Sequence, residues 1–355
     1  MADNTLAYGF VQYASLASER ITTVGESRIW TAIQESAAEH TRQLNGLLAS
    51  FVQRKTDHKE RFMLPGSGTL QSLDENGNPR PVRPSGYFDV AYPIQGGGDA
   101  WGDNRVTRAL MTVDEANRRT LDAMRRDVDW MRRHMMAAVF DNVAWTYADP
   151  EFGNLAIEPL ANNDSVTYVK VGGSTAADNH YLAQSADIDD SNNPFDDIYD
   201  ELMEHPSNKT PVVVYVASNL TSSIEALSAF IEVGDPDLRY GVNTDQIGAS
   251  FDRGFGDEVL GKVNKCWIVE WRALPDSYMI GHAQGGGPVL GMREYDDPSL
   301  QGFFTEAFNL DDNHKGTRMI RYAGFGVMNR IAAVTYYIGG ASHVIPTGYG
   351  APLSV

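Results

Sequence analysis

One cysteine, Cys266, occurs among the 355 residues of the sequence. A single thiol excludes an intrachain disulfide and any zinc site built from several cysteines, and it indicates a chain that folds in a reducing compartment. No stretch approaches the roughly 18 uninterrupted apolar residues that a membrane-spanning helix needs. The first residues also lack the basic start and the apolar stretch of a signal peptide. These absences predict an ordinary globular chain without disulfides or membrane spans.

Lysine is scarce as well, with only 7 lysines among 29 basic residues, and 47 acidic residues give a net charge of −18. Because nucleic-acid binding requires clustered cations that neutralise phosphates, the bulk surface should not grip nucleic acid or an anionic membrane. Arginine makes bidentate, semi-buried contacts more readily than lysine does. The 22 arginines therefore favour contacts between proteins.

Motifs of the common catalytic and cofactor sites are missing. Neither glycine cluster, at 96–98 or at 285–287, is followed by a Lys-Ser/Thr pair, so we interpret both as turns. The eight histidines include no His-x-x-x-His pair. The acidic run at 187–193 has Asn192 where a calcium loop needs glycine, and Cys266 lies in an apolar strand as a small buried hydrophobe. We therefore predict no catalytic residue, no metal and no cofactor.

Residues 62–110 are rich in glycine and proline and have no core of their own. Asn76 and Gly77 are typical of a hairpin turn, and the prolines near them exclude continuous pairing in a central sheet. A loop of almost fifty residues is uncommon in a compact domain and usually serves a function or a partner. Its apolar residues need another surface to pack on: Leu64, Leu70, Phe88 and Tyr92.

Helices are predicted on both sides of this loop. Residues 1–61 show apolar positions at helical spacing and end in a charged section. Thr112 and Glu115 form a capping box, and neither glycine nor proline follows until about Ala144, a rod of roughly 45 Å. Apolar residues step by three or four positions along this helix: Leu121, Met124, Val128, Met131, Met135 and Val139.

Arginine pairs repeat every seven residues along the same helix, at 118/119, 125/126 and 132/133, with aspartates between them. Two interpretations of these arginines remain open. They belong to the solvated face of a core helix, or they form ion pairs along a boundary between subunits.

The second half of the chain combines an acidic block with short strands. Residues 187–260 hold 16 acidic and three basic residues, a net −13 of the total −18. Helices are predicted at 195–204 and 219–231. Strands are predicted at 165–171, 211–216, 266–271, 278–280, 289–292 and 335–338, in a strand-rich finish that runs to residue 340. Helices first, a mixed centre and strands last predict an α+β fold.

This order of parts, and the segments at 274–280 (LPDSYMI) and 322–327 (YAGFGV), resemble the major capsid proteins of tailed double-stranded DNA phages. Their fold is the HK-ninety-seven-like fold, which encapsulin shells share. The resemblance covers nearly the whole chain and implies an N-arm at 1–61, an E-loop at 62–110, a spine helix at 111–146, a peripheral domain at 147–195 with 290–355, and an axial domain at 196–289.

The resemblance also implies a structural subunit, not an enzyme, that forms the hexamers and pentamers of an icosahedral capsid around phage DNA. The DNA would be enclosed without sequence-specific binding, in a virion assembled in the host bacterial cytoplasm. Expected partners are the chain itself, a separate scaffolding protein, a maturation protease or portal, and a cement or decoration protein. The expected subunit contacts lie in the E-loop and the spine helix: Leu70, Asn76, Gly77, Arg80, Phe88, Tyr92, Arg118, Arg125 and Arg132.

Two features of the family can be compared with these residues. Some members join their subunits by an isopeptide bond between an E-loop lysine and an asparagine of a neighbour. No lysine lies between Lys59 and Lys170, so we predict no covalent cross-linking. Because only about 60 residues precede the loop, we also expect an uncleaved N-terminus.

Two other functions fit parts of the sequence. An encapsulin-like compartment that encloses cargo enzymes would have the same fold, and the content of purified shells, protein or DNA, separates it from a capsid. An acidic hydrolase or carbohydrate-binding enzyme would use aromatic platforms such as Trp267, Trp271, Tyr336 and Tyr337. Their alternation within strands favours core packing instead, and a stable monomer in solution would favour the enzyme.

Overall fold

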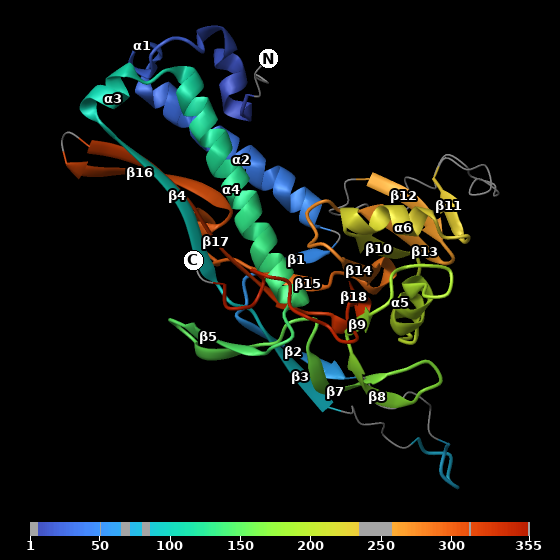
Figure 1. Ribbon diagram of the computed structural model, residues 1–355. Helices are drawn as coiled ribbons and strands as arrows, with labels where there is room; N and C mark the ends of the chain where they lie inside the picture. The colour runs from blue at the N-terminus through green and yellow to red at the C-terminus, as the bar shows by residue number, and fades with distance from the viewer. Residues whose placement is uncertain are drawn as a thin grey trace.

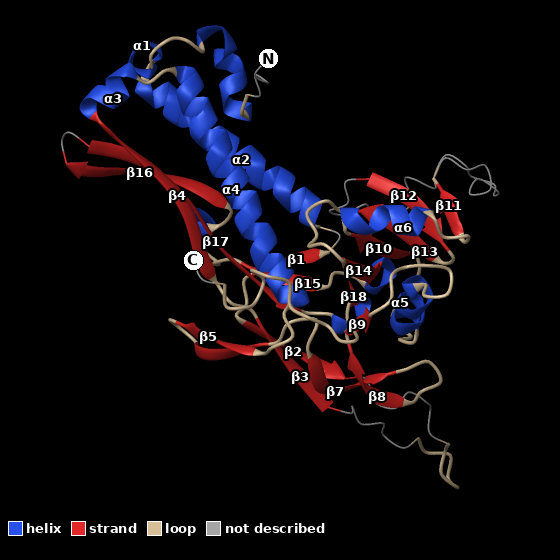
Figure 2. Ribbon diagram, viewed as in Figure 1, coloured by secondary structure: helices blue, strands red, loops and turns tan. Residues whose placement is uncertain are grey.

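The computed structural model describes residues 6–49, 51–64, 72–79, 86–233, 258–311 and 314–353. Figures 1 and 2 show an elongated molecule with long helices at one end and a long antiparallel arm beside them. A second sheet with short helices forms the other side, and a β-hairpin projects at the bottom of the view. Helices and strands are mixed throughout, which confirms the expected α+β class.

Two long helices, α2 (Glu26–Leu48) and α4 (Val113–Phe140), lie side by side (Figure 1). A 3₁₀ helix, η1 (Tyr8–Leu16), and a single turn, α1 (Ile21–Val24), pack against α2. A short helix, α3 (Arg105–Leu110), leads into α4. The helices therefore form one layer at the upper end of the molecule.

The structure confirms the predicted start of α4 after Thr112, but the helix ends at Phe140, before the predicted end at about Ala144. The Thr112 hydroxyl accepts a hydrogen bond from the Glu115 N–H at 3.2 Å, as a capping residue does. The helix ends at Phe140, because Asp141 adopts an extended backbone with φ −66° and ψ 140°. Its carboxylate accepts the Val143 N–H at 2.8 Å, and the chain then enters a strand.

The expected helical section 1–61 is wrong after α2, where the chain forms strands β1 (Val52–Lys55) and β2 (Lys59–Leu64). β1 pairs in parallel with β15 (Leu290–Arg293), with Val52 opposite Leu290. The pairing partner lies more than 200 residues away. Tertiary pairing thus overrides the local helical pattern here.

The first sheet has the strand order β1-β15-β17-β16, and β4 also pairs with β17. Strand β17 (His314–Val327) runs between β16 (Phe303–Asp311) and β4 (Gln95–Asn104), and all three are antiparallel to their neighbours. They form the long arm of Figure 1, with α4 packed across it.

The glycines at 96–98 lie inside β4 and not in a turn as expected. A Cβ at Gly97 would come within 2.7 Å of the Trp130 ring, and one at Gly96 within 2.8 Å of Tyr322. Glycine is needed here because aromatic side chains pack directly on the strand backbone. The second cluster does form a turn, where Gly287 has a φ of 89°.

The second sheet has seven strands in the order β11-β12-β13-β10-β14-β18-β9. Its central strand, β10, is fully buried, as the apolar run predicted. β10 pairs in parallel with β13, and β18 pairs in parallel with β9, whereas the other neighbours are antiparallel. The strands are β9 (Tyr181–Gln184), β10 (Val212–Val216), β11 (Phe230–Glu232), β12 (Glu258–Val263), β13 (Cys266–Glu270), β14 (Tyr278–Ala283) and β18 (Ala333–Ile338).

Helices pack on both faces of the second sheet. Alternate side chains of its central strand, β10, point to opposite faces and therefore enter two different cores. Val213 and Tyr215 share a core with Met135 and Phe140 of α4. The intervening residues of β10 pack against helices α5 (Pro194–Met203) and α6 (Thr221–Glu225). The C-terminal half of α4 thereby joins the two sheets.

The predicted helix at 219–231 is wrong for most of its length. A 3₁₀ turn, η2 (Ser218–Leu220), leads into α6, which ends at Glu225. Phe230 then pairs with Val263 of β12, so the end of the segment is a strand. The helix predicted at 195–204 is confirmed as α5, with Asn193 as its N-cap.

Sheet pairing does not follow the expected division into a peripheral and an axial domain. Strands β9 and β18 come from the segments assigned to the peripheral domain, yet they complete the sheet built by the axial segment 196–289. Backbone hydrogen bonds, such as the one from the Ile338 N–H to the Ser277 carbonyl at 2.9 Å, thus link the two parts into one sheet.

Three two-stranded ribbons complete the fold below the sheets (Figure 1). They pair β2 with β3 (Gly86–Ala91), β5 (Trp145–Asp149) with β6 (Gly153–Ile157), and β7 (Asn163–Val169) with β8 (Thr175–Asn179). Short 3₁₀ turns connect other elements: η5 (Gln284–Gly286), η6 (Pro298–Leu300) and η7 (Arg330–Ala332).

Candidate functional site

The β2–β3 ribbon carries apolar side chains on both of its faces. Phe62 and Phe88 stack at a centroid distance of 5.3 Å, and Phe88 also meets Tyr168 edge-on at 6.4 Å. On the opposite face, Met63 pairs with Tyr87, and these two residues are 62% and 61% exposed. A two-stranded ribbon is marginally stable alone, so two apolar faces indicate a surface that another molecule covers.

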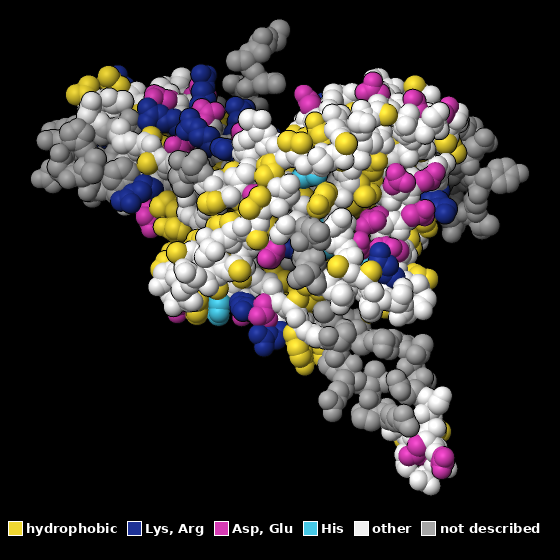
Figure 3. Space-filling model, turned by 60° about the horizontal axis from the view of Figure 1, so that its bottom comes forward, with side chains coloured by type: hydrophobic (Ala, Val, Ile, Leu, Met, Phe, Trp, Pro, Cys, Tyr) yellow, Lys and Arg dark blue, Asp and Glu magenta, His cyan; other side chains and the backbone are white. Residues whose placement is uncertain are grey.

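A turn at the far end of this segment contains the predicted Asn76 and Gly77. The Asp74 carboxylate accepts the Asn76 and Asn78 N–H groups at 2.9 and 2.8 Å, and Gly77 has a φ of 78°. The predicted turn is therefore confirmed. The tip is acidic, because Asp74 and Glu75 are its charged residues at positions 72–79 (Figure 3).

Tyr92 does not need a neighbour to bury it, contrary to the expectation. Its side chain is 0% exposed, and its hydroxyl donates to Glu60 Oε2 at 2.6 Å. Burial and the Glu60 carboxylate raise the pKa of Tyr92. The ring rests on Gly291 and Gly326, which leave room for it. Phe88 is half-buried, and Leu70 and Arg80 lie outside the described residues.

The three expected arginines of α4 form ion pairs within their own helix. Arg118 pairs with Asp114 at 2.7 Å, Arg125 with Asp122 at 3.5 Å, and Arg132 with Asp129 at 3.0 Å. The Arg118 and Arg125 side chains are 68% and 73% exposed, and Arg132 is 34% exposed. These contacts match the solvated-face interpretation within one chain, and the exposed guanidinium groups remain open to a neighbour.

The apolar stripe predicted on α4 faces the core except at one position. Met131, Met135 and Val139 are buried, and Leu121 and Met124 pack partly buried against a core cluster. Val128 is 40% exposed, whereas the preceding residue, Asp127, is 5% exposed. The sequence therefore marked the buried face and missed the buried Asp127 within it.

Asp127 is the centre of a buried ionic cluster that sequence reasoning missed. Arg321 of β17 binds it in a bidentate manner at 2.6 and 2.7 Å, and His40 of α2 lies 2.8 Å from its second oxygen. Burial alone would raise the pKa of Asp127, but the hydrogen bonds from His40 and Arg321 lower it. The cluster joins α2 and α4 to β17 of the arm. Asp127 lies 87 positions from His40 and 194 positions from Arg321, so no local sequence pattern predicts these contacts.

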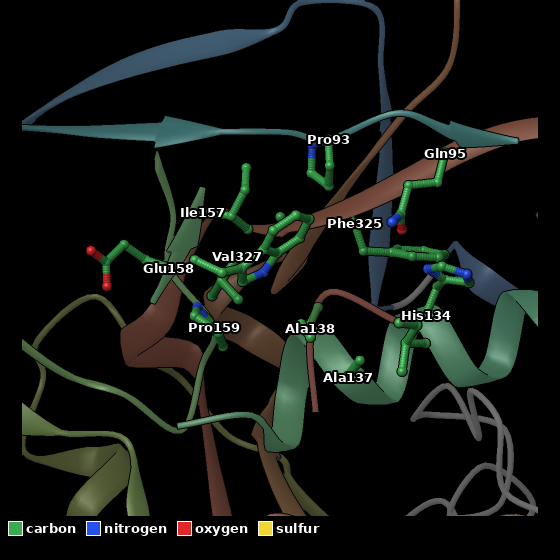
Figure 4. Close-up of a pocket in the computed structure, with 14 residues that line it drawn as sticks. Pro93, Gln95, His134, Ala137, Ala138, Ile157, Glu158, Pro159, Phe325 and Val327 are labelled. Carbon is green, nitrogen blue, oxygen red and sulfur yellow. The ribbon is translucent and has the colours of Figure 1, made fainter. Parts of the chain in front are cut away.

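Several cavities lie between these elements, and three of them differ in size and lining. One holds about 20 Å³, space for about one water, between α4, β4, β6 and β17 (Figure 4). His134 and Phe325 line it, and Glu158 points away (Figure 4). A larger apolar hollow of about 300 Å³ lies between α2, α3 and the arm, and a polar one of about 430 Å³ lies beside β3. None of these linings, within the described residues, combines a serine or cysteine with a histidine.

Cys266, Trp271 and Tyr336, which the sequence offered as candidate functional residues, lie in the hydrophobic cores. Cys266 is fully buried, and burial raises the pKa of its thiol to about 12, which fits the predicted buried hydrophobe. Trp271 and Tyr336 are buried in the two cores, as core packing predicts. No helix in the described part of the chain is long and apolar enough to cross a membrane.

Charge is unevenly distributed over the surface. Figure 3 shows Lys and Arg side chains gathered at the end of the molecule that holds the long helices. Asp and Glu side chains gather on the opposite side.

Comparisons with known proteins identify a phage protein with the same fold. No protein-family model and no curated protein matches the sequence. A chain from Mycobacterium phage Patience superposes with a TM-score of 0.66 and 20% identity over 96% of both chains. The mature capsid of bacteriophage PhiM1 (8% identity, 82% of this chain and 86% of that chain) and the capsid of Cyanophage P-SCSP1u (9% identity, 82% and 86%) both give TM-scores of 0.49. The expected α+β fold is confirmed, and the chain shares it over nearly its whole length with a phage protein.

Proposed function

We propose that this chain is the major capsid protein of a tailed double-stranded DNA phage. It is a structural subunit that self-assembles into hexamers and pentamers of an icosahedral shell around the genome. The fold shared with the Patience phage chain over 96% of both lengths is the observation that carries the proposal. The ribbon with two apolar faces supports it, since a shell subunit must bury such surfaces against its neighbours.

In this proposal the parts of the fold have the roles expected from the family. The N-arm ends with α2, and the E-loop is the β2–β3 ribbon with its turn at 72–79. The spine helix is α4, and the seven-stranded sheet forms the axial domain, including β9 and β18. The subunit-contact residues proposed on the E-loop and spine helix are Asn76, Gly77, Phe88, Arg118, Arg125 and Arg132, to which Met63 and Tyr87 are added.

The proposed partners are other copies of the chain, a separate scaffolding protein, a maturation protease or portal, and a cement protein. Packaged DNA is enclosed without sequence-specific binding, which agrees with the net charge of −18. The proposed location is the virion, after assembly in the host bacterial cytoplasm.

Electron microscopy with light scattering tests the proposal on the chain expressed alone and together with its neighbouring genes. Closed icosahedral shells, hexamers or pentamers are expected. A stable monomer or dimer under every condition would contradict a capsid function. Shells that enclose proteins and no DNA during phage growth would indicate an enzyme compartment instead.

Replacing both exposed residues of the ribbon, Met63→Ser with Tyr87→Ser, should abolish or strongly weaken assembly while the chain stays folded. Full burial of each side chain contributes ~1.5–3 kcal/mol, so losing both weakens each contact by roughly 100-fold or more. Light scattering measures assembly, and circular dichroism with thermal unfolding verifies the fold.

Val143→Ser is the matched control, because Val143 is 57% exposed on a different segment, directly after α4. It should assemble at the wild-type concentration. Assembly of the double variant at that same concentration would show that this face of the ribbon is not a subunit contact.

A further inference from the structure

A cluster of titratable side chains joins the β7–β8 ribbon to the end of α5 (Figure 1). Asp178 is the second-last residue of β8, and His205 directly follows the α5 C-cap residue Glu204. Asp178 and His205 are buried, at 8% and 2% side-chain exposure, and Glu204 is 27% exposed. Such buried groups need nearby partners, because an isolated charge is costly away from water.

The ligand atoms of this cluster lie close together. His205 Nε2 is 2.9 Å from Asp178 Oδ2 and 3.8 Å from Glu204 Oε1. One ligand atom from each of the three residues lies within 4.8 Å of the others. Ligands of one ion at ~2.0–2.2 Å are separated by up to about 4 Å, so small side-chain rotations bring all three onto it.

The charges of the cluster leave room for a further cation. Asp178 and Glu204 contribute two carboxylates, and Glu201 is hydrogen-bonded to Asp178. Lys170 is the facing ammonium group, 2.5 Å from Glu204 Oε1 and 3.9 Å from Asp178 Oδ1. The Lys170 side chain is 25% exposed, so it can swing into solvent when another cation takes its place.

The backbone orients His205 as in metal sites. Its Nδ1 lies 3.3 Å from the Val169 carbonyl oxygen, outside the cluster. In this structure Nε2 hydrogen-bonds Asp178 Oδ2 at 2.9 Å, and a metal ion takes the place of the proton between them when it binds. That nitrogen faces the two carboxylates.

A second, independent observation comes from His180, two residues after Asp178. It is 3% exposed, and its Nε2 has no hydrogen-bond partner among the described residues. Its ring and the His205 ring both contact Tyr168 edge-on, at 5.5 and 6.0 Å. The charges of Asp178 and His205 both act on the His180 ring.

We propose that Asp178, Glu204 and His205 bind a divalent transition-metal ion of the Zn²⁺ type, in exchange for the Lys170 ammonium. Imidazole together with carboxylates suits Zn²⁺ and its neighbours in the first transition row, whereas Ca²⁺ and Mg²⁺ prefer oxygen ligands alone. The ion pins the β7–β8 ribbon to α5 and therefore fastens the lower ribbons to the seven-stranded sheet. The site is independent of the proposed shell function.

Calorimetric titration of the chelator-treated, untagged protein with ZnCl₂ tests this site. One ion per chain is expected, with a rise in the unfolding temperature that grows with free Zn²⁺. Titration with CoCl₂ gives a second readout, since bound Co²⁺ in a site with nitrogen and oxygen ligands absorbs visible light.

Four variants assign the ion to these residues. Glu204→Gln and His205→Gln should weaken Zn²⁺ binding at least 10-fold and remove the Co²⁺ absorption. Lys170→Met should strengthen binding, because it removes the competing ammonium. Glu158→Gln, at a half-exposed carboxylate outside the cluster, should leave the affinity unchanged.

The proposal fails if neither the wild-type protein nor Lys170→Met binds Zn²⁺ in a saturable manner. It also fails if Glu204→Gln binds as tightly as the wild type, which would place the ion elsewhere. Should His205→Gln not fold, the partly exposed Glu204 and Lys170 variants still decide the question.

Discussion

A single carboxylate, Asp127, holds together parts of the molecule that are far apart in the sequence. It neutralises Arg321, which is 1% exposed, and it contacts His40 from the neighbouring helix. Charges at this depth are tolerated only while they remain paired and hydrogen-bonded.

Asp127→Ala should therefore lower the free energy of unfolding by about 3–5 kcal/mol, because it leaves the Arg321 guanidinium buried without its partner. Urea denaturation of the purified chain measures the change. Asp122→Ala, on the exposed face of the same helix, should change stability by about 0.5 kcal/mol or less. Equal effects of the two substitutions would show that the buried cluster contributes little.

His134 should make stability depend on pH. Burial, with a contribution from Arg133, lowers its pKa from the ordinary 6.5 to about 4. As the pH falls below 6.5 the unfolded chain takes up a proton that the folded chain refuses, so the free energy of unfolding declines until about pH 4. The free energy of unfolding falls by at most about 3 kcal/mol over this range, and by less because the His134 ring is only half-buried.

His134→Gln should accordingly lose less stability than the wild type between pH 6.5 and 4, as urea denaturation across this range would measure. Both proteins keep their other buried histidines, so only the difference between the two curves reports on His134. Parallel curves would mean that the ring is protonated equally well in the folded chain.

The sequence predicted the surroundings of single residues better than it predicted which distant residues contact each other. The buried character of Cys266 and the turn at Gly77 follow from neighbours in the sequence, and both were predicted. Asp127 was counted among the solvated aspartates, because nothing local distinguishes it from Asp122. Its partner Arg321 lies 194 positions further along the chain.

At the scale of elements, the contact between β4 and α4 depends on the absence of a side chain. Gly97→Ala should destabilise the protein by roughly 1–3 kcal/mol, because the added methyl would lie 2.7 Å from the Trp130 ring. Gly46→Ala in α2 is the control, since no atom lies within 4 Å of its added methyl. It should stabilise the helix by about 0.5–1 kcal/mol. Thermal unfolding measures both changes, and two changes of the same sign would contradict the expected close contact.

Elements were predictable where local signals decide them. The capping residue Thr112, the apolar run of β10 and the N-terminal signal of α5 all marked real starts or strands. Prediction failed where a distant strand decides, as in β1, which pairs with β15, and at Phe230, which pairs with β12. The candidate ribbon surface was predicted as a loop in need of a partner, but its exposed pair, Met63 and Tyr87, emerged only from the register of the two strands.

At the scale of the whole molecule, the shell proposed for this chain should hold without covalent bonds. The segment between Lys59 and Lys170 contains no lysine, so the E-loop offers no amine for an isopeptide bond. Denatured particles should therefore run as one species at the chain mass of 39.1 kDa on a gel. Bands at dimer or hexamer mass that survive denaturation would contradict this prediction.

The strand order of the arm also sets the timing of folding on the ribosome. Gln95 of β4 pairs with Ala323, so the partner strand emerges after more than 200 further residues have been translated. At ~5–20 residues per second, the nascent β4 waits roughly 10–50 s for it. During that interval its edge lacks a partner strand and can pair with other nascent chains. The yield of folded chain should therefore depend on how far such pairing between nascent chains is suppressed, as well as on the rate of translation.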